Sequence, residues 1–143
     1  MNQQRHNTHL QPPAHGEILT APRPIVLGTW TLQTVPGYTS SGPDHWQSCW
    51  ERTEPAIRRI EQRDWDHPEP SVWTATLEAA ISPTNAGSTV LIGHSLGSIA
   101  IARWVAQYGR PVAGALLVAP VDVESPAVPA ILKMFGPIHM IPF

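Results

Sequence analysis

The chain has 143 residues, an apolar content of 42%, a charged content of 14% and a formal net charge of −2. These values predict one globular domain with a single core, and they give no electrostatic reason to expect nucleic acid or an anionic membrane as a partner. The single cysteine, Cys49, excludes an internal disulfide and fits a reducing compartment. No segment has the form of a secretory signal or the length of a membrane span. We therefore expect a cytoplasmic protein in which Cys49 is a packed or surface thiol.

Residues 1–24 are rich in Gln, Asn, His and Pro and carry no hydrophobic periodicity. This composition predicts a disordered N-terminal extension ahead of a domain over residues 25–143. His6, His9 and His15 fall in the extension without a cysteine or an acidic cluster beside them. We expect them to be solvated and to form no metal site.

Short apolar runs alternate with helical patterns through the rest of the chain. In chain order, the predicted elements are a strand over 30–35, a helix over 43–52 with Pro43 as its first residue, a strand over 56–62, a helix over 71–81 capped by Ser71, a strand over 89–92, a helix over 99–108 ended by Gly109, a strand over 112–119 and a short helix over 125–135. The strand over 112–119 is continuously apolar, which is typical of a strand buried on both faces. Such alternation predicts an α/β fold, a three-layer sandwich around a parallel sheet. The mixed-sign charges between Glu51 and Glu69 are expected to form a solvated edge of this sheet.

The pentapeptide Gly93-His94-Ser95-Leu96-Gly97 follows an apolar strand and precedes a helical pattern. Strand, tight turn and helix are the context in which a G-x-S-x-G sequence becomes a nucleophile elbow, which holds the serine hydroxyl at the carboxyl end of the sheet. The flanking glycines leave room for the helix to pack on the strand. The alternative is an ordinary glycine-rich turn whose serine only caps the helix. We favour the elbow, with Ser95 as the nucleophile.

A serine hydroxyl is a weak nucleophile near neutral pH, so it needs a base, an acid that orients the base, and backbone N–H donors for the oxyanion. One donor is expected from Leu96, the residue after the nucleophile, at the start of a helix. The second is expected from the loop after the first strand, where Gly37 allows a close backbone approach and the N–H of Tyr38 is the candidate. His45 and Trp46 begin the next helix, and we expect them to line the mouth of the site together with Gly37.

The base and its acid partner have no clear place in the sequence. In this fold the chain order is serine, acid, histidine, and the acids and histidine that follow Ser95 are Asp122, Glu124 and His139. A triad of Ser95, His139 and Asp122 is conceivable because Asp122 follows the last predicted strand. It is disfavoured because His139 lies in a proline-bounded segment close to the C-terminus. His94 adjoins the nucleophile, so its side chain is expected to point away from Ser95.

Three segments carry a recognisable pattern: VPGYTSSGPDHWQ at 35–47, VLIGHSLGS at 90–98 and LLVAPVDVE at 116–124. They resemble the small serine hydrolases of the retinoblastoma-binding protein type, in the alpha/beta-hydrolase superfamily, and the resemblance covers about residues 31–143. It implies a compact parallel sheet without a lid domain and a Ser-Asp-His triad whose nucleophile is Ser95. It also implies cleavage of ester or amide bonds in a small-molecule substrate through an acyl-enzyme, without a cofactor or a metal.

In that family the acid follows a fifth strand and the histidine follows a sixth. The resemblance therefore implies that this sequence holds about four of six strands, is truncated at its C-terminus and lacks both triad partners. The family's sheet order would leave the strand over 112–119 as a bare edge with uncovered apolar faces, which favours self-association. Two hypotheses stay open at this point: a serine hydrolase that acts through Ser95, and a catalytically inactive fragment or scaffold that acts as a binding or interaction protein.

Overall fold

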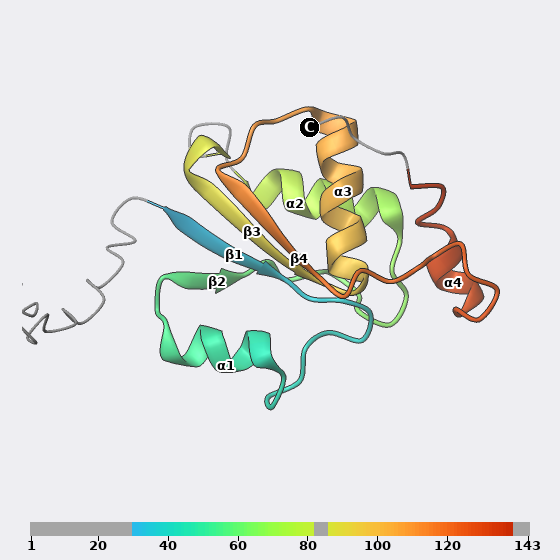
Figure 1. The fold of residues 1–143 in the computed structure, drawn as a ribbon, viewed down its shortest axis with the longest axis horizontal. Helices are drawn as coiled ribbons and strands as arrows, with labels where there is room; N and C mark the ends of the chain where they lie inside the picture. Colours follow the sequence, from blue (N-terminus) through green and yellow to red (C-terminus); the bar gives the residue numbers. More distant parts are fainter. Residues whose placement is uncertain (1–29, 82–85, 139–143) are drawn as a thin grey trace, which may run out of the picture.

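The protein is described by a computed structural model over residues 30–81 and 86–138 (Figure 1). Over these ranges the chain forms a four-stranded parallel sheet in the order β2-β1-β3-β4. In chain order, the elements are β1 (Thr31–Val35), α1 (Trp46–Thr53), β2 (Ile57–Arg59), α2 (Pro70–Ala80), the 3-10 helix η1 (Ala86–Ser88), β3 (Thr89–His94), α3 (Leu96–Tyr108), β4 (Gly114–Val118) and α4 (Ala130–Lys133). The predicted α/β fold with a parallel sheet is confirmed. The predicted N-terminal extension lies outside the described residues.

The sheet is the middle layer of three, with α2 and α3 side by side on one face and α1 on the other (Figure 1). Side chains alternate between the two faces, as the strand geometry requires. Val35 and Leu91 point to the α2/α3 layer, where they pack with the buried Leu77, Ile101 and Trp104. None of the helices within the two described ranges has the length and hydropathy of a membrane span.

The start of α1 differs from the prediction. The helix begins at Trp46 and not at Pro43, because the Nδ1 atom of His45 accepts a hydrogen bond from the N–H of Gln47 at 3.2 Å and so caps the helix. Cys49 lies in this helix as a half-buried free thiol, in agreement with the prediction. The turn before His45 therefore belongs to the loop that follows β1.

The other helix ends are also set by local chemistry. α2 begins at Pro70, which needs no N–H partner in a first turn, so Ser71 does not cap this helix and Glu69 occupies the N-cap position. α3 begins at Leu96, earlier than predicted. It ends at Gly109, whose φ of 60° is the left-handed conformation that the sequence predicted for this glycine.

The strand at the end of the sheet is not buried on both faces, as its apolar run over 112–119 suggested. β4 lies at the edge, and its Leu116 and Leu117 side chains are 45% and 42% exposed. The resemblance to small serine hydrolases implied an edge at this strand, and the sheet order agrees. β2 and α4 are shorter than the predicted ranges 56–62 and 125–135, since β2 pairs with β1 over only three residues and prolines interrupt the segment before α4.

Candidate active site

Ser95 occupies the sharp turn between β3 and α3. Its φ of 51° and ψ of −120° lie outside the regions that residues with a side chain favour. The turn is fixed by two backbone hydrogen bonds, from the Ser95 N–H to the carbonyl of Val118 at 3.0 Å and from the Ser98 N–H to the Ser95 carbonyl at 3.1 Å. The Ser95 residue is half-buried, and its side chain makes no cap hydrogen bond to α3. The turn therefore has the backbone of an elbow, and the alternative of a simple helix cap is wrong.

Glycines border the turn because the backbone approaches too closely there for a side chain. A Cβ atom on Gly97 would lie 2.0 Å from the carbonyl oxygen of Val35 and 2.5 Å from that of Pro36. A Cβ atom on Gly37 would lie 2.9 Å from the Cβ of Ser95. The end of β1 and the loop after it are therefore packed directly against the elbow and the first turn of α3.

This packing brings Gly37, the residue before Tyr38, close to the N–H of Leu96. A Cβ atom on Gly37, the neighbour of Tyr38, would lie only 3.3 Å from the Leu96 nitrogen. Within residues 30–81 and 86–138, neither the N–H of Tyr38 nor that of Leu96 donates a hydrogen bond to another protein group, whereas the next two N–H groups of the loop are bonded. Two unpaired donors beside a partly exposed serine are the arrangement that an oxyanion site needs.

Aromatic rings gather on the α1 side of the elbow. The ring of His45 lies 4.6 Å from the ring of His94, measured between centroids. Trp46 packs against His94 at 6.0 Å and against Trp50 at 4.9 Å. His45 and Trp46 thus lie beside the residue that precedes Ser95, and their lining of the mouth of the site stays a prediction. The contacts of the His94 ring with His45 and Trp46 were not predicted. The position of His94 next to the elbow was the sequence signal for them.

The surroundings of both imidazoles favour the neutral form by lowering their pKa values. Burial lowers the pKa of His45 below its ordinary value, the charge of Arg59 lowers it further, and Glu51 opposes these effects. Burial also lowers the pKa of His94, with a smaller contribution from His45. Neutral His45 is required by its capping bond, because a protonated Nδ1 cannot accept the N–H of Gln47.

The free energy of unfolding is therefore expected to decrease as the pH falls through 6.5, the ordinary value for histidine. Both folded-state pKa values lie below it, so the unfolded chain binds more protons in this window. Urea unfolding about one unit above and below this pH measures the change. His45→Asn keeps a capping acceptor without a titrating group, and we expect it to weaken the pH dependence. A pH dependence equal to that of the wild type would contradict this origin.

A buried glutamine ties the loop after β1 to the sheet. Gln47 has no exposed surface. Its Nε2 donates to the carbonyl of Ile92 on β3 at 2.9 Å, and its Oε1 accepts from the hydroxyl of Ser41 at 2.8 Å. One side chain of α1 thus connects β3, the strand directly before Ser95, with the loop that contains Tyr38. Gln47 was not predicted as a site residue.

The predicted solvated edge between Glu51 and Glu69 is wrong at two positions. Arg59 and Glu51 form an ion pair at 2.9 Å, and their side chains are only 17% and 18% exposed. The register of β2 places Arg59 opposite Thr34, on the face that α1 covers. The two adjacent arginines within a predicted strand, Arg58 and Arg59, were a sequence signal for this pair, but they did not indicate which of the two is buried.

The structure shows no base hydrogen-bonded to Ser95 within the described residues. Among the residues that the structure describes, none forms a hydrogen bond with the Ser95 hydroxyl, and the His94 ring packs on His45 instead. Asp122 is exposed, and its carboxylate accepts the N–H of Glu124 at 3.1 Å. His139 lies outside the described residues. Within the described residues, no hydrogen bond joins Ser95 to Asp122.

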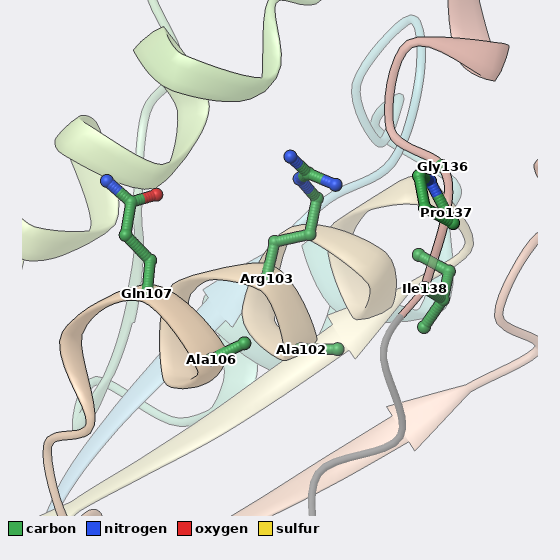
Figure 2. A pocket seen from close by; sticks show the side chains of 7 residues that line it. All are labelled: Ala102, Arg103, Ala106, Gln107, Gly136, Pro137 and Ile138. Atoms are coloured by element: carbon green, nitrogen blue, oxygen red, sulfur yellow. The ribbon is translucent and has the colours of Figure 1, made fainter.

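Two pockets lie away from the elbow. One, of about 310 Å³, is formed by α3 and the segment after α4 and is lined by Ala102, Arg103, Ala106, Gln107, Gly136, Pro137 and Ile138 (Figure 2). The other, of about 260 Å³, is lined by Arg63, Asp64, His67, Glu69, Val72 and Trp73. Ser95 lines neither of them. In the described part of the chain, no cluster of three or more His, Cys, Asp or Glu residues could hold a metal ion.

A parallel α/β fold with a strained serine at a strand-to-helix turn is the arrangement found in serine hydrolases of the α/β type. The serine hydrolase family model matches residues 32–142, and the chain belongs to this family. It is similar to the crystal structure of a YdeN-like hydrolase from Pectobacterium atrosepticum, with 38% identity and a TM-score of 0.61 over 66% of this chain and 51% of that one. The chain thus spans about half the length of that structure. The search of curated proteins finds no match.

Proposed function

We propose that the protein hydrolyses ester or amide bonds of a small-molecule substrate in the cytoplasm, with Ser95 as the nucleophile. The observation that carries this proposal is the strained backbone of Ser95 beside the unpaired N–H groups of Tyr38 and Leu96. Membership of the serine hydrolase family and the likeness to a hydrolase structure support the reaction class. Within the family, the segment at 35–47 supports an assignment to the retinoblastoma-binding protein type.

In the proposed reaction, Oγ of Ser95 attacks the substrate carbonyl carbon while a base removes the hydroxyl proton. The carbonyl oxygen becomes an oxyanion that accepts hydrogen bonds from the N–H groups of Tyr38 and Leu96. Collapse of this intermediate expels the alcohol or amine, which takes the proton, and leaves an acyl-serine that water hydrolyses. Since no described residue bonds to the Ser95 hydroxyl, we assign the base and its acid partner to polypeptide outside the described residues. This chemistry needs neither a metal nor a cofactor.

Labelling with a fluorophosphonate probe tests the nucleophile. We expect the wild-type chain to be labelled and Ser95→Ala to show no labelling above background, because the probe phosphonylates only an activated serine. Ser71→Ala is the matched control, since Ser71 is an exposed serine on α2, and it should label like the wild type. Equal labelling of Ser95→Ala and the wild type would exclude Ser95. A wild-type chain that does not label at any pH would exclude an activated serine in this chain.

A second candidate function is that of a non-catalytic binding protein, and the sheet edge favours it. Leu116 and Leu117 point to opposite faces of β4 and are 45% and 42% exposed, and no strand of the described ranges pairs with the outer edge of β4. For this function we expect self-association through that edge.

Size-exclusion chromatography over a range of concentrations measures the association. The apparent mass of the wild type should rise with concentration, and the double variant Leu116→Lys/Leu117→Lys should elute with a lower apparent mass, because charges block edge pairing. A wild-type chain that elutes as a monomer at every concentration would contradict self-association.

A further inference from the structure

We propose that Arg59 is a positioning residue for the oxyanion loop, which we define as residues 37–45. Its guanidinium fixes the left-handed turn at Thr39 and Ser40 and thereby holds the N–H of Tyr38 toward Ser95. This inference rests on the function proposed for Ser95, and it adds a residue that lies on a different strand from the elbow.

The oxyanion loop contains an unfavourable backbone. Thr39 and Ser40 have φ values of 62° and 67°, in the left-handed region that a β-branched residue such as threonine avoids. Strained residues of this kind persist only where surrounding contacts fix them. Two backbone bonds contribute, from the Thr39 N–H to the Trp65 carbonyl and from the Ser40 N–H to the Gly37 carbonyl, both at 3.1 Å. Because Tyr38 immediately precedes this turn, the direction of its N–H depends on the same contacts.

Arg59 adds side-chain contacts to the same turn. Its Nη1 donates to the carbonyl of Ser41 at 3.1 Å and to the hydroxyl of Ser40 at 3.4 Å. Its Nη2 donates to the hydroxyl of Ser48 at 2.6 Å, and that hydroxyl donates to the Ser41 carbonyl at 3.0 Å. The guanidinium therefore bonds to the strained residue, to the residue after it and to α1.

Glu51 holds the guanidinium in this orientation. The Nε of Arg59 donates to both carboxylate oxygens of Glu51 at 3.1 Å, and Nη2 lies 2.9 Å from Oε2. Glu51 also accepts the hydroxyl of Thr34, which lies on β1 directly before the last residue of that strand. The loop is thereby connected to β1, β2 and α1 through one planar group that uses all three of its nitrogens. Lysine has no such fork and cannot replace it.

Arg58 provides a matched control for the adjacent position. It lies on the same strand but points to the other face of the sheet, opposite Gln33. It is exposed, and among the described residues its side chain bonds only to the backbone carbonyls of Pro55 and Ile57. Replacement of Arg58 removes a positive charge from β2 without touching the oxyanion loop.

Hydrogen exchange by mass spectrometry tests the positioning directly in the full chain. In Arg59→Met, and equally in Arg59→Lys, we expect amides of the oxyanion loop to exchange at least about tenfold faster, while amides of α3 keep their wild-type rates. Arg58→Met should match the wild type in both segments. Unchanged exchange of the loop in Arg59→Met would overturn the proposal. The proposal would also be overturned if amide exchange in the loop and in α3 accelerated by the same factor, because Arg59 would then only stabilise the fold as a whole. If Arg59→Met does not fold, Glu51→Gln is measured instead, with the same two criteria.

The rate of fluorophosphonate labelling separates this proposal from the proposed function. We expect Arg59→Met to lower the maximal rate of Ser95 labelling by about 10- to 100-fold with little change in probe affinity, because a displaced donor weakens the oxyanion and leaves ground-state binding intact. Labelling that depends on Ser95 but is equally fast in Arg59→Met would overturn the positioning role and leave the hydrolase function standing. If the wild type is not labelled, the hydrolase function is refuted, and hydrogen exchange alone decides the role of Arg59 in the loop.

Discussion

Gly97→Ala is expected to destabilise the domain by about 3 kcal/mol or more. In most helices a change from glycine to alanine is favourable by up to about 1 kcal/mol, because alanine has the higher helix propensity. Here the added methyl group would lie 2.0 Å from the Val35 carbonyl oxygen and 2.5 Å from that of Pro36. Both obstacles are backbone atoms at the end of the central strand β1, so relief requires α3 to move away from the sheet. Chemical unfolding followed by circular dichroism measures the loss.

The other glycines provide a graded control. A Cβ atom on Gly93 would lie 2.8 Å from the Cα of Ser98 and 2.8 Å from a terminal methyl group of Ile101. The methyl group is the end of a flexible side chain, so it can move more easily than the backbone atoms that Gly97 faces. A Cβ atom on Gly42 would meet nothing within 4 Å, so Gly42→Ala should change stability by less than about 0.5 kcal/mol. The loss should therefore decrease from Gly97 to Gly93 to Gly42. A Gly97 variant as stable as the Gly42 variant would show that α3 does not pack against the end of β1 in this way.

The elbow could be predicted from the sequence because all of its determinants are local. An apolar strand, a glycine on each side of Ser95 and a helical pattern lie within one short segment, and each restricts the backbone of its neighbours. A side chain at position 97 would collide with Val35, which is distant in the sequence. The sequence nevertheless has a glycine at the position where this collision would occur. Ser95 as the candidate nucleophile and Leu96 as a candidate donor could therefore be proposed from the sequence alone.

The polar support of the oxyanion loop could not be predicted, because it depends on register. Arg59 reaches Ser41 only because β2 pairs with β1 so that Arg59 stands opposite Thr34 on the α1 face. A shift of one residue would place Arg58 on that face instead, since side chains alternate. The sequence supplies two adjacent arginines and does not say which one is buried.

The edge strand shows the limit of the apolar pattern itself. The run that contains Leu116 and Leu117 predicts burial, but a sequence pattern cannot tell which other elements are present to cover those faces. In the described ranges no strand covers the outer edge of β4, and the two leucines are exposed. The predicted start of α1 at Pro43 was wrong for a different reason. The imidazole of His45 caps the helix, and this outweighs the preference of proline for a first helical position.

Gln47→Leu is the second variant for which we expect a large effect, a loss of about 3 kcal/mol. Leucine has nearly the same volume, so the loss comes from hydrogen bonds and not from a cavity. The carbonyl of Ile92 and the hydroxyl of Ser41 would lose the partner that Gln47 provides at 2.9 Å and 2.8 Å. The buried Ser41 hydroxyl would be left without a partner, at a cost of about 1–3 kcal/mol, and the Ile92 carbonyl would keep only its pairing within the sheet. Urea unfolding measures this loss, and hydrogen exchange of the oxyanion loop shows whether the loop is released with it.

Gln62→Leu is the control, and we expect that it does not lower the free energy of unfolding. Gln62 is 6% exposed, and neither its Oε1 nor its Nε2 has a hydrogen-bond partner within the described residues. Gln62→Leu removes two buried unpaired atoms, so it should leave stability unchanged or raise it. If both variants lost the same free energy, glutamine burial alone would explain the result. A loss confined to Gln47 would mean that its bonds hold the strand of Ser95 and the loop of Tyr38 in one arrangement.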